Sequence, residues 1–304
     1  MRMVLDSEVQ DAIAAGAAIV ALESNVISSG LPYPDNIATA YRVEEAVRDA
    51  GAVPATIAVL NGRIRVGLTG DEIEYLGTAH GMRKMSRRDL PLALAQSWSG
   101  GTTVAATMFL AHRAGIRVFA TGGIGGVHRG QPSDVSADLP ELAQTPVMVV
   151  CSGAKAILDL PLTLEWLETH GVPVIGFGTS EFPSFYSRHS GLGVDARADR
   201  PEEVACIFQA QRALGMSTGL LVTVPVPADV ELDHIRMEQA ISAALAEAAT
   251  AGVSGKALTP FLLSRVASLT EGASLQANVA LLENNARVAA TIAIALQSGA
   301  VDEI

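Results

Sequence analysis

Arg117-Val118-Phe119-Ala120-Thr121-Gly122-Gly123-Ile124-Gly125-Gly126 is the stretch that decides the fold. Its first half is a short apolar run of the kind found in buried strands, and its second half is a glycine-rich loop. An amphipathic helical pattern, Thr103 to Ala114, comes just before it. A helix that leads into a buried strand is typical of a parallel sheet covered by helices.

The same alternation of strand and helix extends over about the first 225 residues. We expect strands at Ala18 to Leu22, Thr56 to Leu60, Arg63 to Leu68, Arg117 to Thr121, Val147 to Cys151, Val172 to Phe177 and Leu220 to Val224. We expect helices at Asn36 to Ala50, Thr103 to Ala114, Leu162 to Thr169, Pro201 to Leu214, Leu232 to Ala249, Leu258 to Leu269 and Leu275 to Leu296. Asn61-Gly62 is a two-residue hairpin signal, which predicts one antiparallel pair.

These patterns predict an α/β fold, a single-domain α/β/α sandwich with a mixed, mostly parallel sheet and an all-helical C-terminal portion. No repeat, charge block or Pro/Gly/Ser-rich linker divides the sequence. We therefore expect one domain over residues 1–304.

The composition narrows the classes of function. A net charge of −11 disfavours nucleic-acid binding, which depends on cationic neutralisation of phosphates. The longest apolar runs are shorter than the roughly 20 residues of a membrane span, and the N-terminus lacks the apolar region of a signal peptide. The two cysteines, Cys151 and Cys206, form no metal-ligand pattern. We expect a cytoplasmic protein that binds neither membrane nor nucleic acid.

The 21 basic residues include only three lysines, Lys84, Lys155 and Lys256. A lysine amine can act as a nucleophile when it loses its proton, whereas an arginine cannot. Codon bias that thins lysine out of the sequence explains their scarcity equally well. Gly255-Lys256 lacks the spacing of a Walker A loop, so it carries no nucleotide-binding signal.

In open α/β sheets, ligands bind at the carboxyl ends of the strands. Glu23 follows the first expected strand, Gly122 to Arg129 follow Thr121, and Ser152 to Lys155 follow Cys151. The glycine-rich loop could bring backbone N–H groups to a phosphate, with His128 and Arg129 adding charge, or it could serve a tight turn. Taken alone, the tight turn is the favoured interpretation.

Three further segments contain candidate site residues. Asp138 fits a helix-capping position, whereas Asp134 lies a turn too early and could hold Mg²⁺ or Mn²⁺ with water ligands. Met82 to Asp89 contains four cations and suits an anion site or a solvated face. Asn278 and Asn285 share a helix face, where either could bind a base edge or satisfy buried backbone.

Several blocks together resemble the pseudouridine-5'-phosphate glycosidase family. They are Ala21 to Ser24 followed by Gly30 to Pro34, Lys84 with Met85 to Leu90, Gly100 to Val104, Thr121 to Gly130, Asp134 to Leu139, Cys151 to Lys155 and Glu283 to Arg287. The blocks occur in the family's order and cover nearly the whole chain.

The resemblance implies reversible cleavage of the carbon–carbon bond between uracil and ribose 5-phosphate, with a divalent cation, usually Mn²⁺, in a homotrimer. It implies that Lys155 is the nucleophile, Glu23 the proton donor and Asp134 the metal ligand. It places the substrate-contacting positions at Lys84, Val104, Ser136, Ala137, Asp138 and Asn278.

A C-glycosidic bond has no heteroatom that can be protonated as a leaving group, so two carboxylates alone do not suffice. A Schiff base on Lys155, formed while Glu23 acts as general acid, would provide the electron sink. We expect apolar burial to raise the pKa of Glu23 so that it stays protonated. The alternatives are an aldolase-type Schiff-base enzyme acting on another sugar phosphate, and a non-catalytic oligomer that binds a phosphorylated metabolite.

Overall fold

The computed structural model describes residues 3–253 and 258–299. Its strands are β1 Val4–Leu5, β2 Ile19–Glu23, β3 Val53–Leu60, β4 Arg63–Val66, β5 Arg83–Met85, β6 Gly100–Thr102, β7 Val118–Ala120, β8 Val127–His128, β9 Gln131–Val135, β10 Met148–Cys151, β11 Leu158–Asp159, β12 Val174–Phe177, β13 Ala196–Ala198 and β14 Leu220–Thr223. Its helices are α1 Ser7–Ala15, α2 Asp35–Asp49, α3 Gly70–Thr78, α4 Leu90–Ala95, α5 Val104–Arg113, α6 Asp138–Leu142, α7 Leu160–Thr169, α8 Pro201–Ala213, α9 His234–Thr250, α10 Leu258–Leu269 and α11 Ala273–Gln297, with a π-helical turn at Val26–Gly30 and a 3₁₀ turn at Arg87–Asp89.

The main sheet runs in the order β1-β4-β3-β2-β7-β10-β14-β12-β13, with β6 paired to β3 and β5 to β6. Neighbouring strands are parallel except where β3 pairs with β4 and with β6. The antiparallel β3–β4 hairpin turns at Asn61-Gly62, and both residues have positive φ. The predicted hairpin and the mixed, mostly parallel sheet are confirmed.

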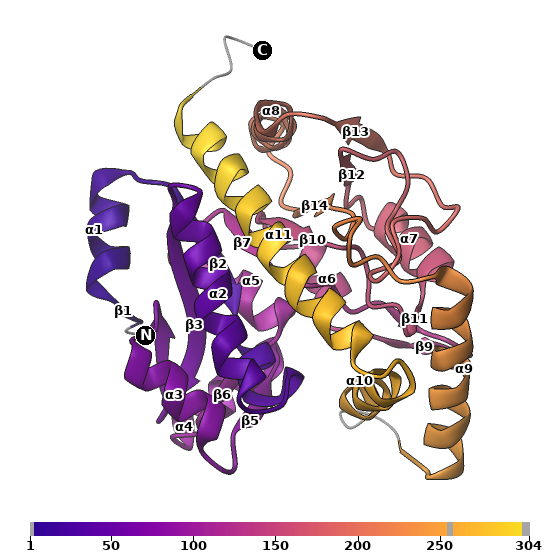
Figure 1. The fold of residues 1–304 in the computed structure, drawn as a ribbon. Coiled ribbons are helices and arrows are strands. Elements are labelled where there is room, and N and C mark those ends of the chain that lie inside the picture. The colour runs from indigo at the N-terminus through magenta and orange to yellow at the C-terminus, as the bar shows by residue number, and fades with distance from the viewer. Residues whose placement is uncertain (1–2, 254–257, 300–304) are drawn as a thin grey trace.

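Helices cover both faces of this sheet (Figure 1). The long helix α11 packs on β2, β7 and β10 between α2 and α8, whereas α5 contacts β2, β3 and β7 from the opposite face beside α6. The predicted α/β/α arrangement and the helical C-terminal portion are therefore confirmed. Each of the predicted strands and helices is present, with ends shifted by a few residues.

The elements that the sequence did not reveal are short or polar. Strand β9 is Gln-Pro-Ser-Asp-Val, with its first three residues exposed, so it lacks the apolar alternation of a strand. It pairs with β8, which pairs with β11, in a separate antiparallel sheet of three strands. Helix α3 is also absent from the sequence prediction, although a Thr69–Glu72 capping box marks its beginning. Lys256 lies outside the described residues.

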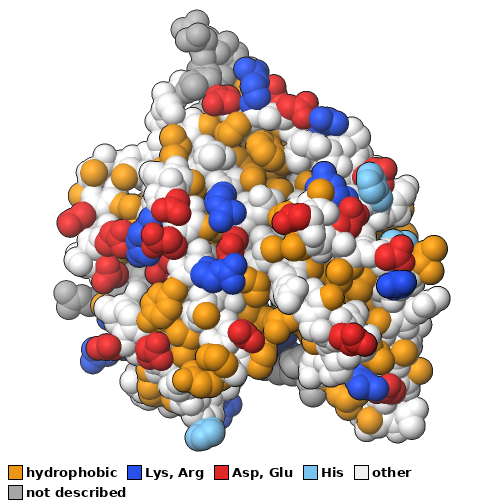
Figure 2. Space-filling view, in the orientation of Figure 1, with side chains coloured by type: hydrophobic (Ala, Val, Ile, Leu, Met, Phe, Trp, Pro, Cys, Tyr) orange, Lys and Arg blue, Asp and Glu red, His pale blue; other side chains and the backbone are white. Residues whose placement is uncertain are grey.

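Helix α11 is long and apolar enough to span a membrane by length and composition, but 61% of its most apolar window is buried inside the structure. Its contacts with three strands of the sheet identify it as a core helix. Figure 2 shows the face that contains α11, where acidic, basic and apolar side chains are interspersed, without a continuous basic patch among the coloured residues.

Asn285 attaches α11 to the loops that leave the sheet. Its side chain is fully buried, and Nδ2 donates to the Thr121 carbonyl at 2.9 Å while Oδ1 accepts from Ser152 Oγ at 3.2 Å. Thr121 follows β7 and Ser152 follows β10. Of the two roles considered for Asn285, satisfaction of buried backbone is confirmed.

We expect Asn285→Leu to destabilise the protein by about 1–3 kcal/mol, because the Thr121 carbonyl would lose its buried partner. Urea unfolding followed by circular dichroism would measure this. The matched control is Asn284→Leu on the neighbouring, partly exposed position, which should change the free energy of unfolding much less. Equal destabilisation by the two substitutions would contradict the structural role of Asn285.

Candidate active site

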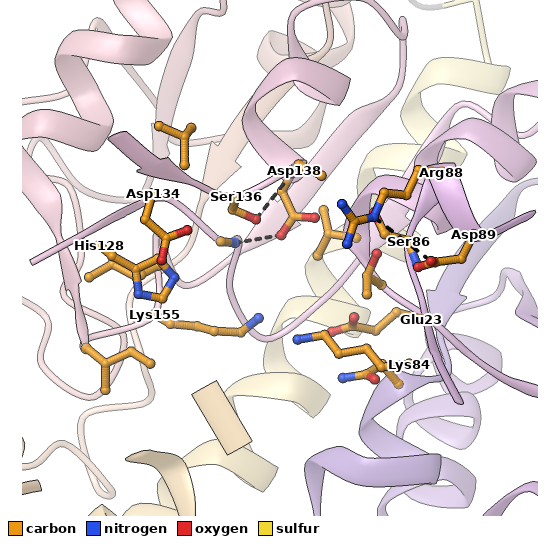
Figure 3. Close-up of a pocket in the computed structure, with 18 residues that line it drawn as sticks. Glu23, Lys84, Ser86, Arg88, Asp89, His128, Asp134, Ser136, Asp138 and Lys155 are labelled. Atoms are coloured by element: carbon orange, nitrogen blue, oxygen red, sulfur yellow. Dashed lines mark hydrogen bonds and ion pairs between the residues drawn. The ribbon is translucent and has the colours of Figure 1, made fainter. Parts of the chain in front are cut away.

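A cavity of about 340 Å³ lies at the carboxyl ends of the central strands. Its lining residues are Glu23, Asn25, Lys84, Ser86, Arg88, Asp89, Thr103, Val104, Gly125, His128, Asp134, Val135, Ser136, Ala137, Asp138, Lys155, Ile157 and Leu158. All but one of the nine positions that the family resemblance implies are in this set. Figure 3 shows that the amines of Lys84 and Lys155 point toward one another beside the Glu23 carboxyl group.

Glu23 is the last residue of β2 and accepts a hydrogen bond of 2.6 Å from Thr121 Oγ1, one residue beyond β7. Burial raises the pKa of Glu23, and the nearby charge of Asp138 raises it further. The Lys155 and Lys84 charges and the Thr121 hydrogen bond oppose this shift without reversing it. The prediction that burial raises the pKa of Glu23 is confirmed, and such a carboxyl group can donate a proton at a higher pH than an ordinary glutamate.

Lys155 lies in the loop after β10, at the end of a sharp backbone turn. Gly153 has a φ of +82°, and a Cβ atom there would collide with the Pro183 carbonyl oxygen. The Lys155 N–H donates to the Ile124 carbonyl at 3.1 Å, which attaches this turn to the glycine-rich loop. The turn thereby directs the lysine side chain into the cavity.

Cys151, four residues earlier, ends β10 and is completely buried. Burial raises the pKa of its thiol to about 12. The thiol therefore stays protonated near neutral pH and does not provide a thiolate nucleophile, because the thiolate is the reactive form. Among these neighbouring residues, the amine of Lys155 is the group suited to nucleophilic attack.

Asp138 organises the polar wall of the cavity. Its carboxylate accepts from the Gly125 N–H at 2.8 Å and from the Ala105 N–H, in the first turn of α5, at 2.9 Å. The expectation that Asp138 caps the helix that follows it is wrong, because Asp138 is the first residue of α6 and its carboxylate instead accepts from an N–H in the first turn of α5. Sequence spacing cannot reveal a cap that comes from another element.

The glycine-rich loop serves close packing. None of Gly122, Gly123, Gly125 and Gly126 has a positive φ, so the tight-turn interpretation is wrong. A Cβ atom at Gly125 would collide with the Ser136 side chain, which shows why the loop can approach β9 and Asp138 only as glycine. Glycine here allows the Gly125 N–H to reach Asp138.

The two charged residues that follow the loop lie in different surroundings. His128 lines the cavity, whereas Arg129 does not. Arg129 pairs with Glu238 at 2.7 Å and donates to the carbonyl groups of Ala156 and Leu158. The idea that Arg129 adds charge to a phosphate site is therefore wrong, because its guanidinium is held by Glu238 and two backbone carbonyls and does not line the cavity.

The four basic residues of the segment Met82 to Asp89 also differ in what they contact. Arg83 stacks on Trp98, with its guanidinium carbon 3.7 Å from the ring centroid, and Arg87 pairs with the buried Glu141 at 2.8 Å. Lys84 and Arg88 line the cavity. Arg88 was not assigned to the site from the sequence, and the anion-site interpretation of the segment was the signal that could have found it.

Apart from Asn278, the residues predicted to contact a metal and the substrate line the same cavity. Asp134 and His128 belong to β9 and β8 of the small sheet, in which Val127 pairs with Val135. Ser136, Ala137 and Val104 line the same cavity.

Asn278 lies outside the main cavity, in an adjoining hollow. That hollow shares Glu23, Asn25, Lys84 and Lys155 with the cavity and is otherwise lined by Val26, Ser29, Gly30, Gly122, Gly123, Phe185, Leu263, Asn278 and Leu282. The two lysines and Glu23 therefore stand where the two spaces meet.

This fold and cavity define an α/β enzyme in which lysine amines face a partly buried carboxyl group at the carboxyl edge of a mostly parallel sheet. The family model described as indigoidine synthase A like protein matches residues 8–295. The pseudouridine-5'-phosphate glycosidase of Caldanaerobacter subterraneus is 55% identical over 294 residues, 96% of each chain. The chain belongs to the pseudouridine-5'-phosphate glycosidase family.

Other relatives agree with this assignment. The pseudouridine-5'-phosphate glycosidase of Methylobacterium nodulans is 56% identical over 95% of this chain and 87% of its own. The crystal structure of a prealnumycin C-glycosynthase in complex with ribulose 5-phosphate matches with a TM-score of 0.90 at 39% identity, over 98% of each chain. That of an indigoidine synthase A-like protein from Thermotoga maritima matches with a TM-score of 0.88 at 37% identity, over 97% of each chain.

The raised pKa of Glu23 predicts a pH-dependent stability difference for Glu23→Gln. Below the ordinary glutamate pKa of about 4.3, the side chain is protonated in both the folded and unfolded states. As the pH rises toward the folded-state pKa, the unfolded chain ionises first and the parent protein loses stability, whereas the glutamine variant does not.

Thermal melting from pH 4 to pH 8 should therefore show Glu23→Gln gaining stability relative to the parent as the pH increases. Glu45→Gln on the exposed face of α2 removes the same formal charge and is the matched control. A constant difference between Glu23→Gln and the parent across this range would contradict the shift.

Proposed function

We propose that this protein reversibly cleaves the C-glycosidic bond of pseudouridine 5'-phosphate to give uracil and ribose 5-phosphate. Relatives that bear this activity in their names are 55–56% identical over nearly the whole chain. The observation that carries the proposal is the meeting of Lys155 with Glu23, a carboxyl group of raised pKa, in one cavity. An amine and a general acid in contact with one ligand are what this bond requires.

The proposed reaction begins at C1' of the sugar. The Lys155 amine forms a bond to C1' as the C1'–O4' bond breaks, and Glu23 provides the proton for O4'. The uracil C5 then gains a proton as the C1'–C5 bond breaks, and the nitrogen lone pair forms the C=N bond of a Schiff base. Water hydrolyses this imine, which releases ribose 5-phosphate and restores the amine.

The two adjoining spaces suit the two halves of the substrate. Asn278 offers an amide to the uracil edge, between the apolar side chains of Phe185 and Leu263. The sugar phosphate extends from Lys155 into the main cavity, past Val104 and along Ser136, Ala137 and Asp138. Lys84 adds a positive charge where the two spaces join.

We further propose that Asp134 holds Mn²⁺ or another divalent cation. The described residues contain no group of three His, Cys, Asp or Glu side chains placed to hold a metal, so the protein offers no complete cage. A single cavity-lining carboxylate still fits Mg²⁺-like binding, in which waters and a substrate phosphate provide the other ligands. When bound, the cation would neutralise charge between the phosphate and the nearby carboxylates.

The alternatives are less well supported. An aldolase-type enzyme would use the lysine and a phosphate site without releasing uracil, and a binding oligomer would perform no chemistry. A close structural neighbour is named a C-glycosynthase and was solved in complex with ribulose 5-phosphate, which favours C-glycosidic chemistry on a pentose phosphate. A homotrimeric assembly and a cytoplasmic location are part of the proposal.

The covalent step predicts a trappable adduct. Sodium borohydride added during incubation with ribose 5-phosphate or pseudouridine 5'-phosphate should reduce the Schiff base to a secondary amine, and peptide mass spectrometry should locate the added mass on Lys155. Lys155→Arg should neither trap nor turn over, because arginine keeps the charge but offers no lone pair.

Lys84→Arg is the matched control, since it keeps a cation and should show weaker substrate binding with residual trapping. An adduct on Lys84 would reverse the roles of the two lysines. Uracil release without any adduct would rule out the covalent mechanism.

The proposed function and its metal can be tested in one assay. With pseudouridine 5'-phosphate and Mn²⁺, the protein should release uracil, detected chromatographically; EDTA should abolish most activity, and added Mn²⁺ should restore it. Asp134→Ala should stay folded and resist that rescue. No uracil from the parent protein would reject the function, and full activity of Asp134→Ala with EDTA would reject the metal site.

A further inference from the structure

Within the proposed function, the position of the substrate phosphate follows from how the cavity and the hollow join. Glu23, Lys84 and Lys155 line both spaces, so the sugar C1' must lie at their junction. If uracil occupies the hollow with Asn278, the rest of the sugar extends into the main cavity. The phosphate, at the far end of a five-carbon chain, then lies away from both lysines.

The wall that would surround that phosphate contains more acidic than basic side chains. Of the residues that line the main cavity but not the hollow, Asp89, Asp134 and Asp138 bear carboxyl groups. Arg88 is the one side chain in this described set with a permanent positive charge. A phosphate monoester carries up to two negative charges near neutral pH, so it needs a cation at this end of the cavity.

Arg88 is suited to this role by what it contacts. Its guanidinium lies 4.0 Å from Asp89 Oδ1, at the outer limit of an ion pair, and 76% of its side chain is exposed. The adjacent arginines differ: Arg83 is stacked on Trp98, and Arg87 is paired with Glu141. In Figure 3, the Arg88 guanidinium extends toward Ser136 and Asp138 above the space occupied by the two lysines.

We propose that Arg88 is the residue that recognises the 5'-phosphate and makes the enzyme select phosphorylated substrate over the free nucleoside. This inference rests on the proposed function. The planar guanidinium can donate two parallel hydrogen bonds to phosphate oxygens, a geometry that a lysine cannot match. Its exposed position lets the side chain turn onto the phosphate without breaking a buried contact.

Steady-state kinetics with pseudouridine 5'-phosphate and pseudouridine provide the first test. Arg88→Gln should lower kcat/KM for the phosphorylated substrate by at least about 10-fold, mainly through KM, because a hydrogen bond to a charged group is lost. Reaction with pseudouridine should change little. Arg88→Lys should lie between the parent and Arg88→Gln, since a point charge replaces the planar fork.

Arg83→Gln is the matched control, because it removes the same charge from the same segment outside the cavity, and it should leave the preference for the phosphate intact. Melting temperatures confirm that each variant is folded. If Arg88→Gln affects both substrates equally or neither, or if Arg83→Gln has the same effect, the assignment of Arg88 is overturned.

Calorimetric binding of ribose 5-phosphate and ribose separates this inference from the proposed function. Arg88→Gln should weaken ribose 5-phosphate binding by about 10-fold or more, and this should hold even if the parent protein releases no uracil. That result would keep the phosphate role of Arg88 while rejecting the reaction. Unchanged ribose 5-phosphate binding by Arg88→Gln, in a protein that does release uracil, would overturn the inference alone.

Discussion

The register of three parallel strands determines how the site is built. Ala120 of β7 is paired with Leu22 of β2 on one side and with Val150 of β10 on the other. Each strand ends within one residue of that row, so Glu23 and the turn that leads to Lys155 leave the sheet at the same edge. A parallel sheet places carboxyl ends together in this way, which brings an acid and an amine from distant parts of the chain into one cavity. Asn285 on α11 forms hydrogen bonds with Thr121 and Ser152, the residues that directly follow two of these strands.

At that edge, burial and the lysine charges shift the pKa of Glu23 in opposite directions. Two lysines favour its ionised form, whereas desolvation and the Asp138 carboxylate favour the protonated form, and desolvation is the largest effect. A carboxyl group of raised pKa beside amines suits proton donation followed by nucleophilic attack. Asp138 therefore has two effects: its carboxylate accepts from the Gly125 and Ala105 N–H groups, and its charge raises the pKa of Glu23.

The central strands, the Asn61-Gly62 hairpin and the lysine, carboxyl and glycine positions could be predicted from the sequence because each is encoded by local pattern or by the end of a strand. The partners of polar side chains could not. Arg129 is held by Glu238 from α9, and Asp138 caps a helix that precedes it in the chain. The arginines of the basic segment look alike in sequence, yet stacking on Trp98 and pairing with Glu141 remove two of them from the site. Such choices depend on tertiary contacts between elements that lie far apart in sequence.

The division of the site into two spaces explains why its charges are unevenly placed. The hollow with Asn278 has apolar walls in Phe185, Leu263 and Leu282, which suit a flat, neutral base. The main cavity is polar and is lined by three aspartates. A phosphorylated ligand therefore binds there only if cations offset the negative charges of the phosphate and the carboxylates. The bond between base and sugar would then span the junction, where Glu23 and Lys155 line both spaces. In the proposed reaction, the substrate is held at both ends, which places the bond to be broken beside the acid and the amine. Holding the reacting groups in this orientation lowers the entropic part of the activation barrier.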